Sequence, residues 1–85
     1  EYQPEAKLAY LAALMYDGVS TRHALMDGNK RAGAIASLTF IAMNGSFLDV
    51  SETELEAKLR ARVASELSVS DLAEYFEVNI YPDIE

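Results

Sequence analysis

Apolar residues in this chain recur at three- and four-residue spacing, which is the spacing of one face of an α-helix. In the first segment this pattern is formed by Leu8, Leu11, Ala12, Met15 and Val19. The chain has no cysteine, so neither a disulfide framework nor a thiolate metal site can replace a packed core. No convincing β-hairpin signal is present, and residues 46–50 would be an isolated extended segment. The sequence therefore predicts an all-α fold of one compact helical bundle.

Helix-start and helix-stop residues set the expected bounds of the first two helices. The first begins near Pro4 and continues to about residue 21. The second spans about residues 29–44, because Asn44 and Gly45 form a typical helix end. Small residues in the second helix would allow close packing, which suits the central helix of a bundle. They are Ala32, Gly33, Ala34, Ala36 and Ser37.

Two further helices are predicted in the second half of the chain. Ser51 and Glu54 form a capping box, and the helix that follows is expected to reach about residue 64. Ser70 is expected to cap the fourth helix, which Pro82 prevents from continuing. The inward stripes of these helices would be Leu55, Leu59 and Val63, then Leu72, Ala73 and Phe76.

Three cations of the third helix stand four residues from an acidic partner. The predicted pairs are Glu54/Lys58, Glu56/Arg60 and Arg62/Glu66. Pairs at this spacing lie on the outer surface of a helix and stabilise it slightly. We interpret these cations as a solvated, salt-bridged face and not as an anion site.

Charge and hydropathy exclude several classes of protein. The net charge of −7 argues against general nucleic-acid binding, which depends on Lys and Arg neutralising phosphates. No apolar run reaches the roughly 18 residues of a membrane span, and no export signal is present, so we expect a cytoplasmic protein. The basic residues are clustered, because Arg22, Lys30 and Arg31 lie close together and no carboxylate occurs between Asp27 and Asp49. Such a stretch in an acidic protein favours an anion.

Residues 27–31 lie where a loop is expected to enter the second helix. The free N–H groups and the dipole at a helix start favour negative charge, so the adjacent cations Lys30 and Arg31 are unfavourable there for stability alone. Gly28 lets a ligand approach the backbone, and Asn29 is a good cap that can also donate to a phosphate oxygen. The pattern therefore predicts a phosphate site.

Two more residues near this loop have suitable chemistry. Asp27 offers one carboxylate, and Mg²⁺ is commonly bound by one or two carboxylates together with substrate phosphates. His23 is the only histidine and titrates near neutral pH, as a general base for a hydroxyl should. Each residue alone also has an ordinary structural role, since Asp-Gly-Asn is a common turn and a lone histidine is usually structural. The order of these residues along the chain favours the functional interpretation over the structural one.

The segment HALMDGNKR, residues 23–31, resembles the signature of the Fic/Doc family. In that signature a histidine, an apolar residue two places on, an acidic residue, glycine and asparagine lead into a helix, and an arginine follows. The Doc (death-on-curing) branch has lysine where Fic proteins have a second glycine, as at Lys30. It also lacks the later arginine of Fic proteins, as at Ala34. The resemblance extends through AIASLTFIAMNG and SELSVSDLAEYF, and it implies a Fic/Doc-like bundle whose motif loop leads into a central helix.

Doc toxins transfer the γ-phosphate of ATP to a threonine of elongation factor Tu, which stops translation. The resemblance thus implies a protein kinase that is the toxin of a toxin–antitoxin pair, with ATP and Mg²⁺ required. His23 would position or deprotonate the target hydroxyl, and Asp27 would hold Mg²⁺. The nucleotide phosphates would be bound by Gly28, Asn29, Lys30 and Arg31. A cognate antitoxin with a disordered tail is the implied partner.

The chain departs from the family in two respects. Ala24 and Leu25 stand where the family usually has proline and an aromatic residue, so we expect a less rigid loop. Family members also have helical sequence before the first helix, and a chain lacking this region would have weak or no activity. Two alternatives stay open. They are Fic-like AMP transfer to a protein hydroxyl and a catalytically inactive helical interaction module.

Overall fold

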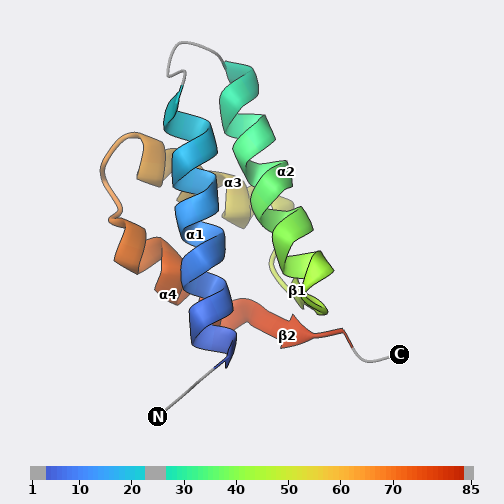
Figure 1. Cartoon of the computed structure of the whole chain (residues 1–85). Helices are drawn as coiled ribbons and strands as arrows, with labels where there is room; N and C mark the ends of the chain where they lie inside the picture. The colour runs from blue at the N-terminus through green and yellow to red at the C-terminus, as the bar shows by residue number, and fades with distance from the viewer. Residues whose placement is uncertain (1–3, 23–26, 84–85) are drawn as a thin grey trace.

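The computed structural model describes the backbone of residues 4–22 and 27–83 and the side chains of residues 6–20 and 31–83. Within these residues the chain is mostly helical, as predicted, with one small sheet in addition (Figure 1). None of the described helices is long and apolar enough to cross a membrane. The elements are α1 (Pro4–Arg22), α2 (Asp27–Met43), β1 (Ser46–Leu48), α3 (Glu52–Val63), α4 (Val69–Asn79) and β2 (Ile80–Pro82).

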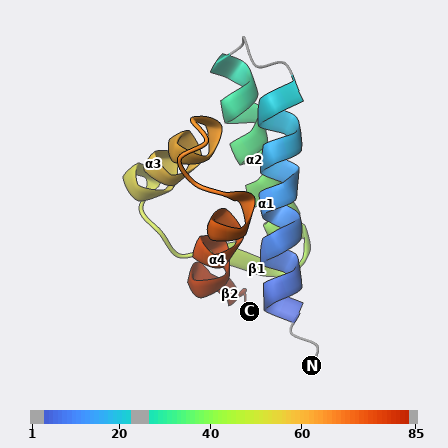
Figure 2. The ribbon, with the colours of Figure 1, turned by 90° about the vertical axis from the view of Figure 1, so that its left-hand side faces the viewer.

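The helices form two layers. Helices α1 and α2 lie antiparallel in one layer, and α3 and α4 lie in the other (Figure 2). Helix α1 packs extensively on α2 and α4 and also contacts α3. The centre of the bundle is therefore α1, whereas the sequence predicted α2. Small residues on α1 explain the difference, because they let two neighbours approach it at once.

The buried face of α1 is rotated from the predicted stripe. Ala12 belongs to both faces, but Leu11 is exposed and Met15 and Val19 are only partly buried. Helix α1 is apolar on most of its circumference, so periodicity alone does not select one face. Packing selects the face with the smallest side chains, together with one large aromatic residue. The buried residues of α1 are Ala9, Ala12, Ala13, Tyr16 and Ser20.

The apolar residues of α2 at helical spacing, Ile35, Leu38, Ile41 and Ala42, likewise do not together form its buried face. Ile41 is buried, but Ile35 is 59% and Leu38 37% exposed. The buried positions follow four-residue spacing from Gly33 through Ser37 to Ile41. A Cβ atom at Gly33 would lie 3.0 Å from the Tyr16 Cδ1 atom, so the missing side chain permits the close approach of α1 and α2. The apolar face of α2 is consequently left partly uncovered.

The caps of α3 and α4 are both serines. Ser51 accepts a hydrogen bond from the Glu54 N–H at 3.0 Å, which confirms the predicted cap at Ser51. Helix α4 is capped by Ser68 and not by Ser70, with Ser68 accepting from the Asp71 N–H at 3.0 Å. Val69, the first residue of α4, is partly buried and packs against the core. The inward positions Leu72, Ala73 and Phe76 are buried, as predicted.

A two-stranded antiparallel sheet pairs β1, which follows α2, with β2, which follows α4. Strand β1 pairs with β2 in a register that places Phe47 opposite Tyr81 and Leu48 opposite Ile80. Gly45, at φ 79°, makes the turn out of α2. The fold is therefore not purely helical. The prediction that residues 46–50 would be an isolated extended segment is wrong, because residues 46–48 pair with β2.

The cations of α3 have three different surroundings. Arg60 pairs with Glu56 at 2.9 Å, as predicted. Lys58 lies over the ring of Tyr75, 5.2 Å from its centroid. Arg62 is largely buried and pairs with Asp17 of α1 at 2.7 Å, so its predicted place on a solvated face is wrong. It also donates to the Leu67 carbonyl oxygen at 2.9 Å and so joins α1 to the loop before α4.

Replacing Arg62 with methionine is expected to lower the free energy of unfolding by about 1–3 kcal/mol, because two charge-assisted contacts are lost in a partly buried place. Urea unfolding followed by circular dichroism measures this change. The matched control is Glu56→Gln, which breaks an exposed ion pair and should cost less than about 0.5 kcal/mol. Equal losses in the two variants would mean that the Arg62 contacts contribute no more than a surface pair.

Candidate functional site

The motif residues lie at the start of α2. This helix begins at Asp27, two residues earlier than predicted, so Gly28, Asn29 and Lys30 form its first turn. The first N–H groups of a helix have no partner within the helix. The backbone of residues 27–31 therefore lies at the start of the second helix, as predicted. His23 lies outside the described residues, as do the side chains of the predicted site residues Asp27, Asn29 and Lys30 and the burial of Gly28.

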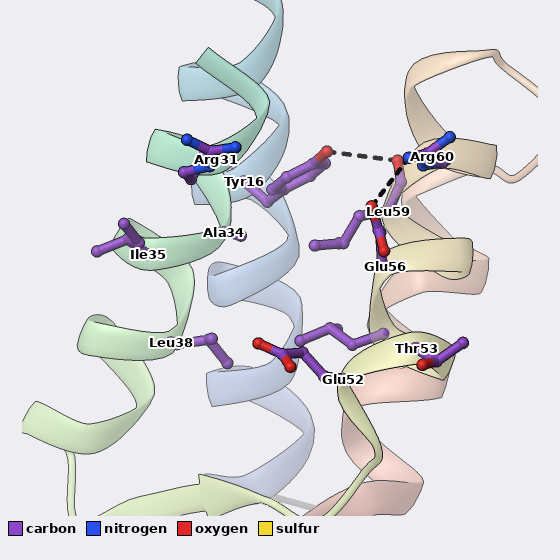
Figure 3. Close-up of a pocket in the computed structure, with 11 residues that line it drawn as sticks. Tyr16, Arg31, Ala34, Ile35, Leu38, Glu52, Thr53, Glu56, Leu59 and Arg60 are labelled. Carbon is purple, nitrogen blue, oxygen red and sulfur yellow. Dashed lines mark hydrogen bonds and ion pairs between the residues drawn. The ribbon is translucent and has the colours of Figure 1, made fainter. Parts of the chain in front are cut away.

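Arg31 is the predicted site residue whose side chain is described. It is exposed and stands on one wall of a groove of about 720 Å³ between α2 and α3 (Figure 3). The α2 wall is completed by Ala34, Ile35 and Leu38. Ile35 and Leu38, two of the exposed apolar residues of α2, thus both lie at the groove. The α3 wall consists of Glu52, Thr53, Leu55, Glu56, Leu59 and Arg60.

Tyr16 of α1 forms the floor of the groove. Its side chain is 1% exposed, and its hydroxyl donates to the Leu59 carbonyl oxygen of α3 at 3.3 Å. Burial raises the pKa of the Tyr16 hydroxyl above its ordinary value of 10.0, so the group stays neutral at physiological pH. Tyr16 therefore fixes α3 relative to α1 and thereby sets one dimension of the groove.

The charges of the groove are separated along its length. Arg31 and Arg60 lie at the end nearer the start of α2, on opposite walls (Figure 3). Glu56 lies beside Arg60, and Glu52 lies toward the other end (Figure 3). An anion is therefore favoured at the end next to the motif and disfavoured at the other.

Sequence reasoning did not identify Arg60 as a residue of this groove. Its spacing from Glu56 correctly predicted an ion pair, but a pair on one helix does not reveal what the helix faces. The only available signal was the proximity of Lys58, Arg60 and Arg62 along the chain. That signal predicts a common face, whereas the three side chains point to three different neighbours.

Among the residues whose side chains are described, no group of three or more His, Cys, Asp or Glu could hold a metal ion. The side chain of the predicted magnesium ligand Asp27 lies outside this set. Its position at the start of α2 is compatible with the predicted role, because Mg²⁺ can take most of its ligands from phosphates and water.

Comparisons with protein-family models, with curated proteins and with solved structures found no match to this chain.

Proposed function

We propose that this protein is a Doc-type phosphotransferase that moves the γ-phosphate of ATP to a threonine hydroxyl of elongation factor Tu. One observation carries the proposal. The last five residues of the segment that resembles the Doc signature, 27–31, are the first residues of α2, and the groove lined by Arg31 and Arg60 lies beside this helix start. A motif in the structural context that its chemistry needs is stronger support than a match of letters.

The size and lining of the groove suit a nucleotide. Ligand pockets typically have volumes of about 300–1,000 Å³ and combine apolar walls with a few polar groups. The groove has about 720 Å³, apolar side chains such as Ile35 and Leu38, and cations at one end. Phosphates would lie at this end, against the N–H groups of the first turn of α2 and the side chains of Lys30 and Arg31.

In the proposed reaction the oxygen of the threonine hydroxyl attacks the γ-phosphorus. The bond from this phosphorus to the oxygen bridging to the β-phosphate breaks, and ADP leaves with the electron pair. His23 accepts the hydroxyl proton. Asp27 would hold Mg²⁺, which when bound neutralises charge on the phosphates. Lys30 and Arg31 would orient the triphosphate so that the γ-phosphorus, and not the α-phosphorus, meets the hydroxyl.

The same proposal includes a partner, which is a cognate antitoxin whose disordered tail folds onto the toxin.

The alternative of Fic-like AMP transfer needs a different orientation of the triphosphate. Lysine at position 30 stands against that orientation, because a lysine side chain needs space that a glycine would leave open and adds a positive charge. Ala34 also stands against it, because this residue of the groove wall brings no second cation from α2. An inactive helical module would bind no nucleotide.

Lys30→Ala tests nucleotide binding directly. Titration calorimetry with Mg²⁺ and ATP is expected to give measurable binding to the parent protein and at least about tenfold weaker binding to the variant, since a charge-assisted contact is lost. Lys7→Ala on α1 is the control, with the same loss of charge at a residue outside the motif. No binding by the parent protein would refute the proposed function and favour the inactive module.

A further inference from the structure

We infer that Arg60 of α3 is a second anion-binding residue of the groove and binds the same polyphosphate as Arg31, from the opposite wall. The identity of the polyphosphate as ATP rests on the proposed function. The placement of Arg60 does not, because it follows from described side chains alone.

The two arginines stand on opposite walls of the groove (Figure 3). Arg31 comes from α2 and Arg60 from α3, and both line the end of the groove nearer the start of α2 (Figure 3). The Tyr16 ring lies on the floor between them. A polyphosphate carries several negative oxygens, so it can meet cations from both walls at once. Arginine is suited to this contact because its planar guanidinium binds phosphate through two parallel hydrogen bonds.

Arg60 is accessible to an anion in solution. Its side chain is 73% exposed and that of its partner Glu56 63% exposed. Such an ion pair contributes little in water, because solvent screens both charges. A phosphate group with more than one negative charge therefore competes well with the single carboxylate of Glu56. Leaving this pair costs little, whereas Arg62 would have to leave two contacts in a partly buried place.

The other two cations of α3 have different surroundings from Arg60. Lys58 lies over Tyr75 of α4, and Arg62 is joined to Asp17 and Leu67. Neither residue lines the groove. The cations of α3 thus do not form one solvated face, and of these three residues Arg60 alone lines the groove.

The test is titration calorimetry with two probes, MgATP and inorganic tripolyphosphate. Arg60→Gln is expected to weaken the binding of both probes about tenfold, because a charge-assisted contact is lost. Glu56→Gln is expected to strengthen both about threefold, because Arg60 loses its competitor. The matched control for Arg60→Gln is Lys58→Gln on α3, which also removes one positive charge. The matched control for Glu56→Gln is Glu77→Gln on α4, which also removes one negative charge, and neither control residue lines the groove. At physiological ionic strength their effect should stay within about twofold.

The outcomes separate this inference from the proposed function. Binding of both probes with the expected order of the variants supports the inference. If MgATP binds and Arg60→Gln behaves like Lys58→Gln, the inference is overturned and the proposed function stands. If only tripolyphosphate binds and the expected order holds, Arg60 keeps its role and the proposed function falls. Binding of neither probe overturns both.

Discussion

Replacing His23 with alanine is expected to slow phosphoryl transfer to elongation factor Tu by about 10²–10⁴-fold, which is the usual contribution of a positioned general base. The expected change in ATP affinity is small, because His23 acts on the hydroxyl of the protein substrate and not on the nucleotide. Single-turnover rates at saturating ATP measure the first quantity, and calorimetry with MgATP measures the second.

Arg31→Gln is the informative control for the His23 prediction. Arg31 is expected to hold phosphate, so this variant should lose ATP affinity together with rate. His23→Ala should therefore lower mainly the rate of phosphoryl transfer, whereas Arg31→Gln should lower both this rate and the ATP affinity. A loss of ATP affinity in His23→Ala as large as that in Arg31→Gln would contradict the role of His23 as a base for the hydroxyl.

Replacing Tyr16 with alanine is expected to lower the free energy of unfolding by about 3–5 kcal/mol, because removal of a buried aromatic side chain leaves a cavity. The side chain is 1% exposed and touches the closest approach of α1 and α2 at Gly33. A chain of this size has a total stability on the order of 5–10 kcal/mol. Urea unfolding should therefore show a large shift of the midpoint, or no folded state at all.

Tyr16→Phe keeps the ring and removes only the hydroxyl. Its bond to the Leu59 carbonyl is long at 3.3 Å, so we expect a loss of no more than about 1 kcal/mol. This variant also keeps Tyr16→Ala interpretable, because it stays folded and can be assayed for nucleotide binding. Similar losses of stability in the two variants would mean that the hydroxyl, and not the packing of the ring, is the main contribution of Tyr16.

Local signals in the sequence predicted the elements of the fold well. The four helices, the helix cap at Ser51 and the Glu56–Arg60 pair depend on residues at most four positions apart. The pairing of β1 with β2 depends on segments more than 30 residues apart, and each strand has only three residues. No local pattern specifies such a contact. The fourth helix started early for a related reason, since Ser68 and Ser70 are both good caps and tertiary packing of Val69 decides between them.

The faces of α1 and α2 were not predictable from periodicity. Both helices carry apolar residues on several sides, and close packing at Gly33 selected one side of each. The same selection left Ile35 and Leu38 at the groove. The phosphate-binding motif is local and could be found in the sequence, but the groove beside it is a property of the packed helices. Arg60 could be connected with the motif only after α3 was placed opposite α2.

The central claim is the transfer of a phosphoryl group to a protein hydroxyl, and intact-mass analysis of purified elongation factor Tu tests it most directly. The factor is incubated with this protein, Mg²⁺ and ATP, with the His23→Ala variant in parallel. We predict a gain of one phosphoryl group with the parent protein and no gain, over the same time, with the variant. A gain of AMP, or an unchanged mass with a folded protein that binds ATP, would contradict the claim.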